Sequence, residues 1–299
     1  MSHLEEIIGL GFLVEEQSKE SIEKINDKKF EEFKKYLKEE KPFMVTKDVI
    51  VKFLARDIEI VKQFKPVDSF TVNDFVQSLN KRYSFLQDVL LSKVELKNII
   101  SINKVPGSGN VTVIGLIKDM LEKNTNRVVV LEDPTGYIET LIDKKLTEKM
   151  VLDDVIAASG RVSNKTLIVD RVFFPSVPLR PVNYTKESVK VAFADKKADA
   201  DYIISEKDLK DKIKKKTYKI KSPYIIKINE VVILVAPGYD PIEMLNKRYI
   251  NINRMDFLID PVPDVIFTDK NINMSYKGIS IVPKNKAIDL KTRKVEDLK

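Results

Sequence analysis

Acidic pairs are the residues of this chain whose type and spacing suggest metal chemistry. The sequence of 299 residues has 45 aspartates and glutamates, no cysteine and one histidine, His3, which we expect at a frayed terminus. The lack of cysteine excludes disulfides, thiolate metal sites and cysteine nucleophiles. Two acidic pairs, Glu132-Asp133 and Asp153-Asp154, offer the oxygen ligands that hard cations prefer. Their setting favours structural roles, in which Asp133 opens a Pro-Thr-Gly turn and Asp153-Asp154 closes a short helix.

Basic residues form a second group, which could contact the phosphates of nucleic acid. Lysine and arginine number 52, so the net charge is +7, and the estimated pI is about 9.1. This balance permits attraction to nucleic acid by counterion release or to an acidic protein. The candidate nucleic-acid-binding residues are Lys118, Lys123, Arg127, Tyr137, Lys214, Lys215 and Lys216. For the basic run from Lys207 to Lys221, a solvated surface is the alternative interpretation.

Helical spacing dominates the first part of the chain. Apolar residues recur every three or four positions from Leu4 to about Leu54, which predicts a small helical bundle. Thr46 to Asp48 suits the N-cap of a short helix that runs to Leu54. Ile58 to Pro66 has the character of a connector, and Val72 to Leu91 is predicted to be an amphipathic helix.

Beyond this helix the apolar pattern changes to short blocks rich in valine and isoleucine, which is typical of strands. Five strands are predicted, at Val111 to Leu121, Arg127 to Glu132, Tyr137 to Ile142, Val155 to Val162 and Thr166 to Phe174. A short helical stretch, Lys145 to Leu152, lies between the third and the fourth. Five strands with a helix at this place predict a closed barrel of the oligonucleotide/oligosaccharide-binding (OB) fold, and Gly115 supplies the bend that closes it.

After Pro178 the chain becomes rich in lysine and then gives short buried strand blocks. These blocks, at Tyr224 to Ile228, Val231 to Val235, Val265 to Phe267 and Ile279 to Val282, predict a mixed sheet with few helices. The predicted fold class is therefore α+β with several domains. The predicted domains are a helical domain (1–56), a linker and helix (57–92), an OB-fold (93–178) and a C-terminal domain (179–299).

Several of these segments, in order, resemble the small, exonuclease-type subunit of archaeal D-family DNA polymerase and the B subunits of eukaryotic replicative polymerases. The resemblance rests on Asp74 to Tyr83, Val113 to Ile117, Val130 to Gly136, Val151 to Ile156 and Phe173 to Pro178. In that family a calcineurin-like phosphoesterase domain follows the barrel. Its catalytic members hold two metal ions with aspartates, histidines and an asparagine, which polarise an attacking water.

The phosphoesterase motifs implied by this resemblance are degraded here. Phe193 to Lys197 is similar to the Ser-Asp-x-His motif, with Asp195 kept and Lys197 at the histidine position. Pro237 to Asp240 is similar to the Gly-Asn-His-Asp motif, with Gly238 and Asp240 kept. Asp269 to Asn273 stands where Gly-His-x-His is expected. Asp195 and Asp240 are thus vestigial ligands, and the C-terminal domain is expected to be a degenerate phosphoesterase remnant without metal or cofactor.

The resemblance implies a non-catalytic accessory or scaffold subunit of a replicative DNA polymerase or replisome assembly. Its partner would be a polymerase catalytic subunit or another replisome protein, in a hetero-oligomer. A free single-stranded-DNA-binding protein is the alternative function, but it needs exposed aromatic residues, and the barrel strands are mostly aliphatic. A nuclease with a remodelled site is a third. Direct contact with DNA stays open.

The first residues and the overall composition suggest where the protein works. Glutamates follow Met1 where a signal peptide would be basic, and no stretch approaches membrane-spanning length. We expect a cytoplasmic, nucleoid-associated protein. The many lysines and glutamates are typical of heat-stable proteins, which suggests a thermophilic archaeal source.

Overall fold

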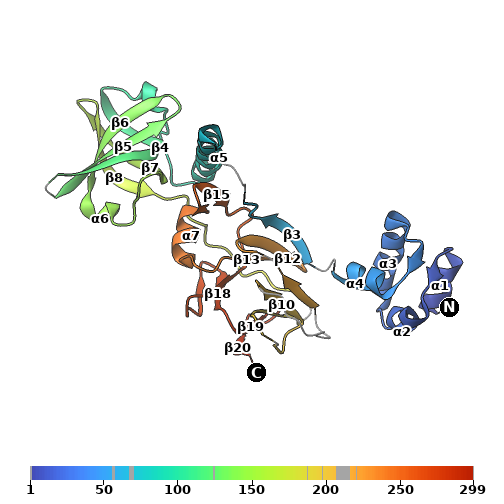
Figure 1. Cartoon of the computed structure of the whole chain (residues 1–299). Coiled ribbons are helices and arrows are strands. Elements are labelled where there is room, and N and C mark those ends of the chain that lie inside the picture. Colours follow the sequence, from blue (N-terminus) through green and yellow to red (C-terminus); the bar gives the residue numbers. More distant parts are fainter. Residues whose placement is uncertain are drawn as a thin grey trace.

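The computed structural model describes residues 2–55, 58–66, 71–123, 125–186, 188–196, 198–206, 216–219 and 221–298. They form an N-terminal helical unit, a closed barrel and two C-terminal sheets (Figure 1). No helix in these ranges is long and apolar enough to cross a membrane.

The N-terminal unit combines short helices with one small parallel ladder. Its elements are α1 (His3–Gly9), β1 (Leu13–Val14), η1 (Glu16–Ser18), α2 (Lys19–Glu23), α3 (Asp27–Glu40), β2 (Met44–Val45) and α4 (Lys47–Ala55). The predicted helices are present, while β1 pairs with β2 through Leu13 and Met44. The core contains Phe30, Phe33 and Leu37 from α3.

His3 does not lie at a frayed terminus as predicted. Ser2 and Glu5 form a capping box that fixes the first turn of α1. The His3 ring stacks on Phe30 with 3.9 Å between centroids, and its Nε2 lies 3.2 Å from an oxygen of Asp27. The only histidine of the chain is therefore part of the packing of this unit.

The predicted connector is also partly wrong, because its first six residues form strand β3 (Ile58–Gln63). This strand pairs antiparallel with β12 (Tyr224–Ile228) at the edge of a C-terminal sheet. Three of its six residues are apolar, but Ile60 and Val61 are exposed, so no alternation of buried and exposed side chains marks the strand. Its partner is far along the chain, which local patterns cannot reveal.

The barrel agrees closely with the predicted strands. It contains β4 (Ser108–Lys123), β5 (Asn126–Asp133), β6 (Gly136–Asp143), β7 (Val155–Ser163) and β8 (Thr166–Phe173), in the closed order β4-β5-β6-β8-β7. The short helix α6 (Lys144–Thr147) lies between β6 and β7, and η2 (Ile102–Lys104) precedes the barrel. A Cβ atom on Gly115 would lie 2.9 Å from Leu131 Cβ, so β4 and β5 approach too closely there for a larger residue.

The C-terminal part is a sandwich of two sheets. The six-stranded sheet has the order β17-β18-β16-β13-β12-β3, and the five-stranded sheet has the order β11-β10-β9-β19-β20. Their strands are β9 (Lys190–Phe193), β10 (Tyr202–Ser205), β11 (Lys216–Lys219), β13 (Val231–Val235), β16 (Val265–Thr268), β17 (Met274–Tyr276), β18 (Ile279–Pro283), β19 (Lys286–Asp289) and β20 (Val295–Asp297). Phe193 and Phe267, one from each sheet, meet in the core between them. All four predicted strand blocks are confirmed.

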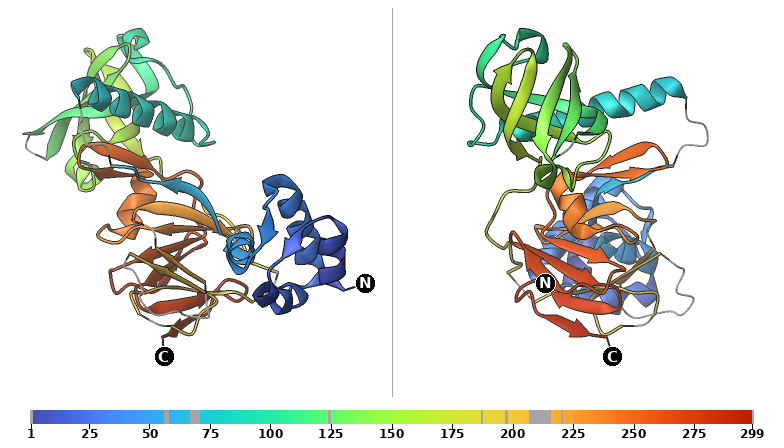
Figure 2. Two further views of the ribbon diagram at one scale, coloured as in Figure 1. Left: turned by 45° about the vertical axis from the view of Figure 1, so that its right-hand side comes forward. Right: turned by 90° about the vertical axis from the view of Figure 1, so that its left-hand side faces the viewer.

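Three elements connect the barrel with the sandwich. They are the helix α5 (Val72–Leu91), predicted with these bounds, the helix α7 (Pro241–Lys247) and the hairpin of β14 (Tyr249–Ile252) and β15 (Met255–Leu258). Leu86 and Leu90 of α5 pack in one cluster with Ile114 of β4 and Tyr249 of β14. Figure 2 shows α7 and this hairpin at the end of the sandwich that faces the barrel.

Candidate functional site

Asp195, predicted to be the remnant of a metal ligand, lies two residues after β9 and is paired with a lysine of the same chain. Lys284 follows β18, and its Nζ donates to Asp195 Oδ2 at 2.8 Å. Ser205 Oγ donates to the other carboxylate oxygen at 3.0 Å. The Lys284 ammonium also lies 5.0 Å from the centroid of the Phe193 ring. The Asp195 carboxylate is thus paired with a cation of the same chain.

Asp240, the other residue predicted to be a remnant of a metal ligand, is the N-cap of α7. Its Oδ1 accepts hydrogen bonds from the backbone nitrogens of Ile242 at 3.0 Å and Glu243 at 2.9 Å. Such a cap satisfies two of the unpaired N–H groups at the start of a helix. Gly238 N donates to Asp269 Oδ1 at 2.8 Å, so the Asp269 carboxylate is also bonded to the backbone.

These groups do not converge on a metal centre. Among the residues that the structure describes, no cluster of three or more histidine, aspartate or glutamate side chains could hold a metal ion. Lys197, at the histidine position of the first motif, lies outside these residues.

The acidic pairs of the barrel have structural partners. Asp133 Oδ1 accepts from Thr135 N at 2.7 Å and Gly136 N at 3.0 Å, which confirms its predicted place in the turn. The role predicted for Asp153-Asp154 is wrong, because α6 ends at Thr147 rather than running to Leu152. Asp154 instead accepts from Val151 N and lies buried where the barrel meets the sandwich.

The predicted nucleic-acid residues of the barrel fall into two places. Lys118 and Tyr137 come together, with the Lys118 ammonium 5.7 Å from the ring centroid, but Lys118 is also paired with Glu132 at 2.8 Å. Arg127 pairs with Glu122 at 3.1 Å, and Lys123 is exposed at the end of β4.

Acidic neighbours therefore offset much of this positive charge. Tyr137 is 70% exposed, as a stacking residue would have to be. Of the C-terminal candidates, Lys214 and Lys215 lie outside the described residues, and Lys216 is the first residue of β11.

A polar network joins the barrel to the sandwich, and sequence reasoning missed it. Arg82 of α5 donates to Asp256 of β15 at 2.9 Å, and both side chains are almost fully buried (2% and 3% exposed). Arg82 also lies over the Tyr249 ring, 4.5 Å from its centroid. Tyr249 Oη donates to Asp154 Oδ1 at 3.0 Å, and Lys247 of α7 lies 3.3 Å from the same oxygen.

Burial dominates the titration of this network. It raises the pKa of the Asp154 carboxyl, although Lys247 and the hydrogen bonds act in the opposite direction. Burial and then the neighbouring Asp154 raise the pKa of Tyr249, so the phenol stays protonated and donates. The network therefore stabilises one arrangement of barrel and sandwich. No local signal could have found it, because its members lie on segments far apart in the sequence.

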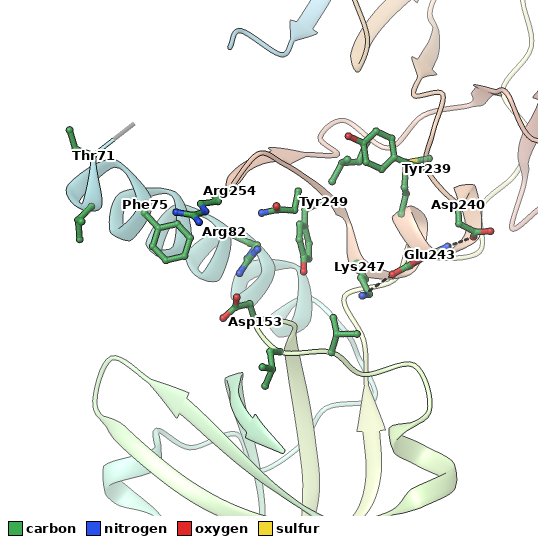
Figure 3. Close-up of a pocket in the computed structure, with 16 residues that line it drawn as sticks. Thr71, Phe75, Arg82, Asp153, Tyr239, Asp240, Glu243, Lys247, Tyr249 and Arg254 are labelled. Carbon is green, nitrogen blue, oxygen red and sulfur yellow. Dashed lines mark hydrogen bonds and ion pairs between the residues drawn. The ribbon is translucent and has the colours of Figure 1, made fainter. Parts of the chain in front are cut away.

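A cavity of about 620 Å³ opens beside this network, as Figure 3 shows. Thr71 and Phe75 of α5 line one side, and Glu243 and Lys247 of α7 line the other. Asp240 lies at the far end of this cavity, and Arg82 and Tyr249 form part of its wall.

Comparisons with known proteins identify relatives of the chain. No family model matches it. The DNA polymerase II small subunit of Methanothermobacter thermautotrophicus is 31% identical over 132 residues, covering 41% of this chain and 27% of the relative. The corresponding subunits of Archaeoglobus fulgidus and Pyrococcus abyssi are 30% and 29% identical, covering 41% and 46% of this chain and 25% of each relative.

The chain is thus a relative of the archaeal DNA polymerase II small subunits, and the matched part spans about a quarter of their length. Among solved structures, OBody AM1L10 bound to hen egg-white lysozyme matches with a TM-score of 0.25 and 12% identity, covering 27% of this chain and 96% of that one. A similarity this weak says nothing about function.

Proposed function

We propose that this relative of the archaeal polymerase small subunits is a non-catalytic scaffold subunit of a replicative DNA polymerase or replisome assembly. One observation carries the non-catalytic part, the ion pair of Lys284 with Asp195 at 2.8 Å. A lysine ammonium beside the kept aspartate repels a divalent cation, and two-metal hydrolysis needs two such cations a few ångströms apart.

The arrangement around this pair supports a phosphoesterase remnant. Asp195 follows β9, Gly238 to Asp240 follow β13, and Asp269 follows β16. Each degraded motif thus directly follows a strand of the two-sheet sandwich, where loops commonly carry catalytic residues. Since the only histidine packs in the N-terminal unit, imidazole ligands are lacking, and we infer that the sandwich survived for binding.

The barrel has the features of an OB-fold used as a scaffold. Its strand order places β6 beside β8 in parallel, with α6 between β6 and β7, as in OB-folds. One outer face is covered by α5 through Tyr83, whose hydroxyl donates to Ile114 O at 3.2 Å. Because Lys118 and Arg127 already pair with glutamates, protein packing is the better supported role for the barrel.

The partner follows from the relatives, which are named as small subunits of a polymerase. We infer a hetero-oligomer with a polymerase catalytic subunit or another replisome protein. The test is affinity purification of the tagged full chain from its native cells after nuclease treatment, with mass spectrometry of the proteins that copurify. Recovery of a polymerase catalytic subunit or replisome protein in fixed proportion supports the proposal. If proteins copurify without nuclease treatment but are lost after it, DNA bridges them to the chain, and the proposal is contradicted.

A further inference from the structure

A second, larger groove lies next to the cavity beside the polar network, and Asp240, Glu243 and Lys247 line both. Its volume is about 1350 Å³. Lys93 and Val94, just after α5, line one wall, and Leu179, after the last barrel strand, lines another. Arg248 and Lys277 line it from the sandwich. Its lining also contains the carboxylates of Glu95, Glu148, Asp240 and Glu243, of which Asp240 caps α7 and Glu243 pairs with Lys247. The groove therefore lies along the segment that leads from the barrel into the sandwich.

Three cations in this groove are held by neutral oxygens. Lys93 Nζ donates to Ser176 O at 3.3 Å, and Lys277 Nζ donates to Val177 O at 3.0 Å. Arg248 donates from Nε and Nη2 to a backbone carbonyl at 3.1 and 2.9 Å and is only 5% exposed. Within the described ranges none of these cations forms an ion pair with a carboxylate.

The positive charges are close enough to affect one another. Burial and then Lys277 lower the pKa of Lys93, and Arg248 adds to them, while Glu95 acts in the opposite direction. Half-buried like charges raise the free energy of the unbound protein. An incoming carboxylate would relieve this repulsion and form charge-assisted hydrogen bonds.

Apolar side chains stand exposed beside these cations. Val94 is 90% exposed and Leu179 is 83% exposed, although both line the groove. A nucleic-acid backbone would neutralise the lysines and leave these two side chains facing water. A peptide that carries both acidic and apolar residues satisfies both features, since interfaces combine apolar anchors with complementary charge.

We propose that this groove binds an acidic peptide segment of a partner protein, with a carboxylate between Lys93 and Lys277 and an apolar side chain against Leu179. This inference rests on the scaffold function proposed above and specifies the chemistry of the partner. Its test does not need the polymerase, so a failure of the peptide-binding proposal would leave the scaffold proposal intact.

The test selects peptides from a random peptide library displayed on phage, with the full chain as target. We expect enrichment of sequences that combine aspartate or glutamate with leucine or phenylalanine. Fluorescein-labelled copies then give dissociation constants by fluorescence anisotropy. The double variant Lys93→Gln with Lys277→Gln should weaken binding at least tenfold, because glutamine keeps a hydrogen-bond donor but removes the charge. Leu179→Ser should weaken binding several-fold, because it removes the apolar contact.

The control is Lys123→Gln, which removes one positive charge from the exposed end of β4, as Lys93→Gln or Lys277→Gln alone does in the groove, and should change affinity less than twofold. A peptide with lysine in place of each acidic residue should not bind the unaltered chain, and this readout is independent of any variant's folding. The proposal fails if no acidic sequences are enriched, if the control variant weakens binding as much as the double variant, or if an oligothymidylate displaces the peptide as well as unlabelled peptide does.

Discussion

Replacing Lys284 with methionine should destabilise the sandwich, because it leaves Asp195 without its cation. The two side chains are 25% and 20% exposed, so the pair lies between a surface ion pair, worth about 0–1 kcal/mol, and a buried one, whose disruption costs about 3–5 kcal/mol. We expect a loss of about 1–2 kcal/mol in the free energy of local unfolding. The contact of Lys284 with the Phe193 ring lies at the same position and is lost too.

A double-mutant cycle of Lys284→Met and Asp195→Asn isolates the pair from other effects. Hydrogen–deuterium exchange of peptides from β9 and β18 reports the local free energy without requiring the whole chain to unfold together. The more exposed pair Lys190–Glu296 serves as control and should couple by less than about 0.5 kcal/mol. If the Lys284–Asp195 coupling is no larger than that of the control, or if Lys284→Met stabilises the sheets, the reasoning is refuted.

Three further predictions concern the barrel and its contact with the sandwich. Arg82→Met should lower stability by about 3–5 kcal/mol in thermal unfolding, because the buried Asp256 carboxylate loses its cation and keeps only the hydrogen bonds from Ser78 and Asn251. Adding Asp256→Leu should recover most of this loss, and equal stability of both variants would contradict the prediction. Burial raises the pKa of Asp154 in the folded state, so its ionisation costs stability as the pH rises from below its unfolded pKa through its folded pKa. The stability of the native chain relative to Asp154→Asn should therefore fall between acidic and neutral pH, and a stability difference that does not change with pH would contradict this. Gly160→Ala should cost at least about 2 kcal/mol in urea unfolding, since the added Cβ would lie 1.9 Å from Ile168 O. Gly238→Ala has open space around the added Cβ but a φ of +85°, so it should cost about 1 kcal/mol, and equal losses for the two variants would refute this ranking.

Local sequence patterns were sufficient to predict the elements that bury an apolar face. The barrel strands and α5 follow from short valine-rich blocks and from one helical stripe, because each buries its apolar side against a single core. Strand β3 was missed because its exposed residues are ordered by pairing with β12 rather than by their own burial. The end of α6 was misplaced because residues 151–154 form a turn, in which Asp154 accepts from Val151 N and the backbone of Asp153 and Asp154 bonds to Ile117 of β4.

The candidate site was predictable only in part. Asp195 and Asp240 were predicted to be remnants of motifs, which stays a prediction, and their partners in the structure could not be predicted. Lys284 is one of many lysines, and nothing in its neighbours marks it as the cation that meets Asp195. Arg82 lies within an ordinary helical segment, so only the packing of α5 on β15 reveals its burial.

The most direct test of the scaffold function is to mix the purified full chain with the polymerase subunit that copurifies with it, after nuclease treatment. Size-exclusion chromatography with light scattering then measures the mass of any complex at low and at high salt. We predict one complex of fixed stoichiometry that persists when salt screens charge contacts, because a scaffold interface also buries apolar surface. Separate elution of the two proteins at both salt concentrations would contradict the proposed function.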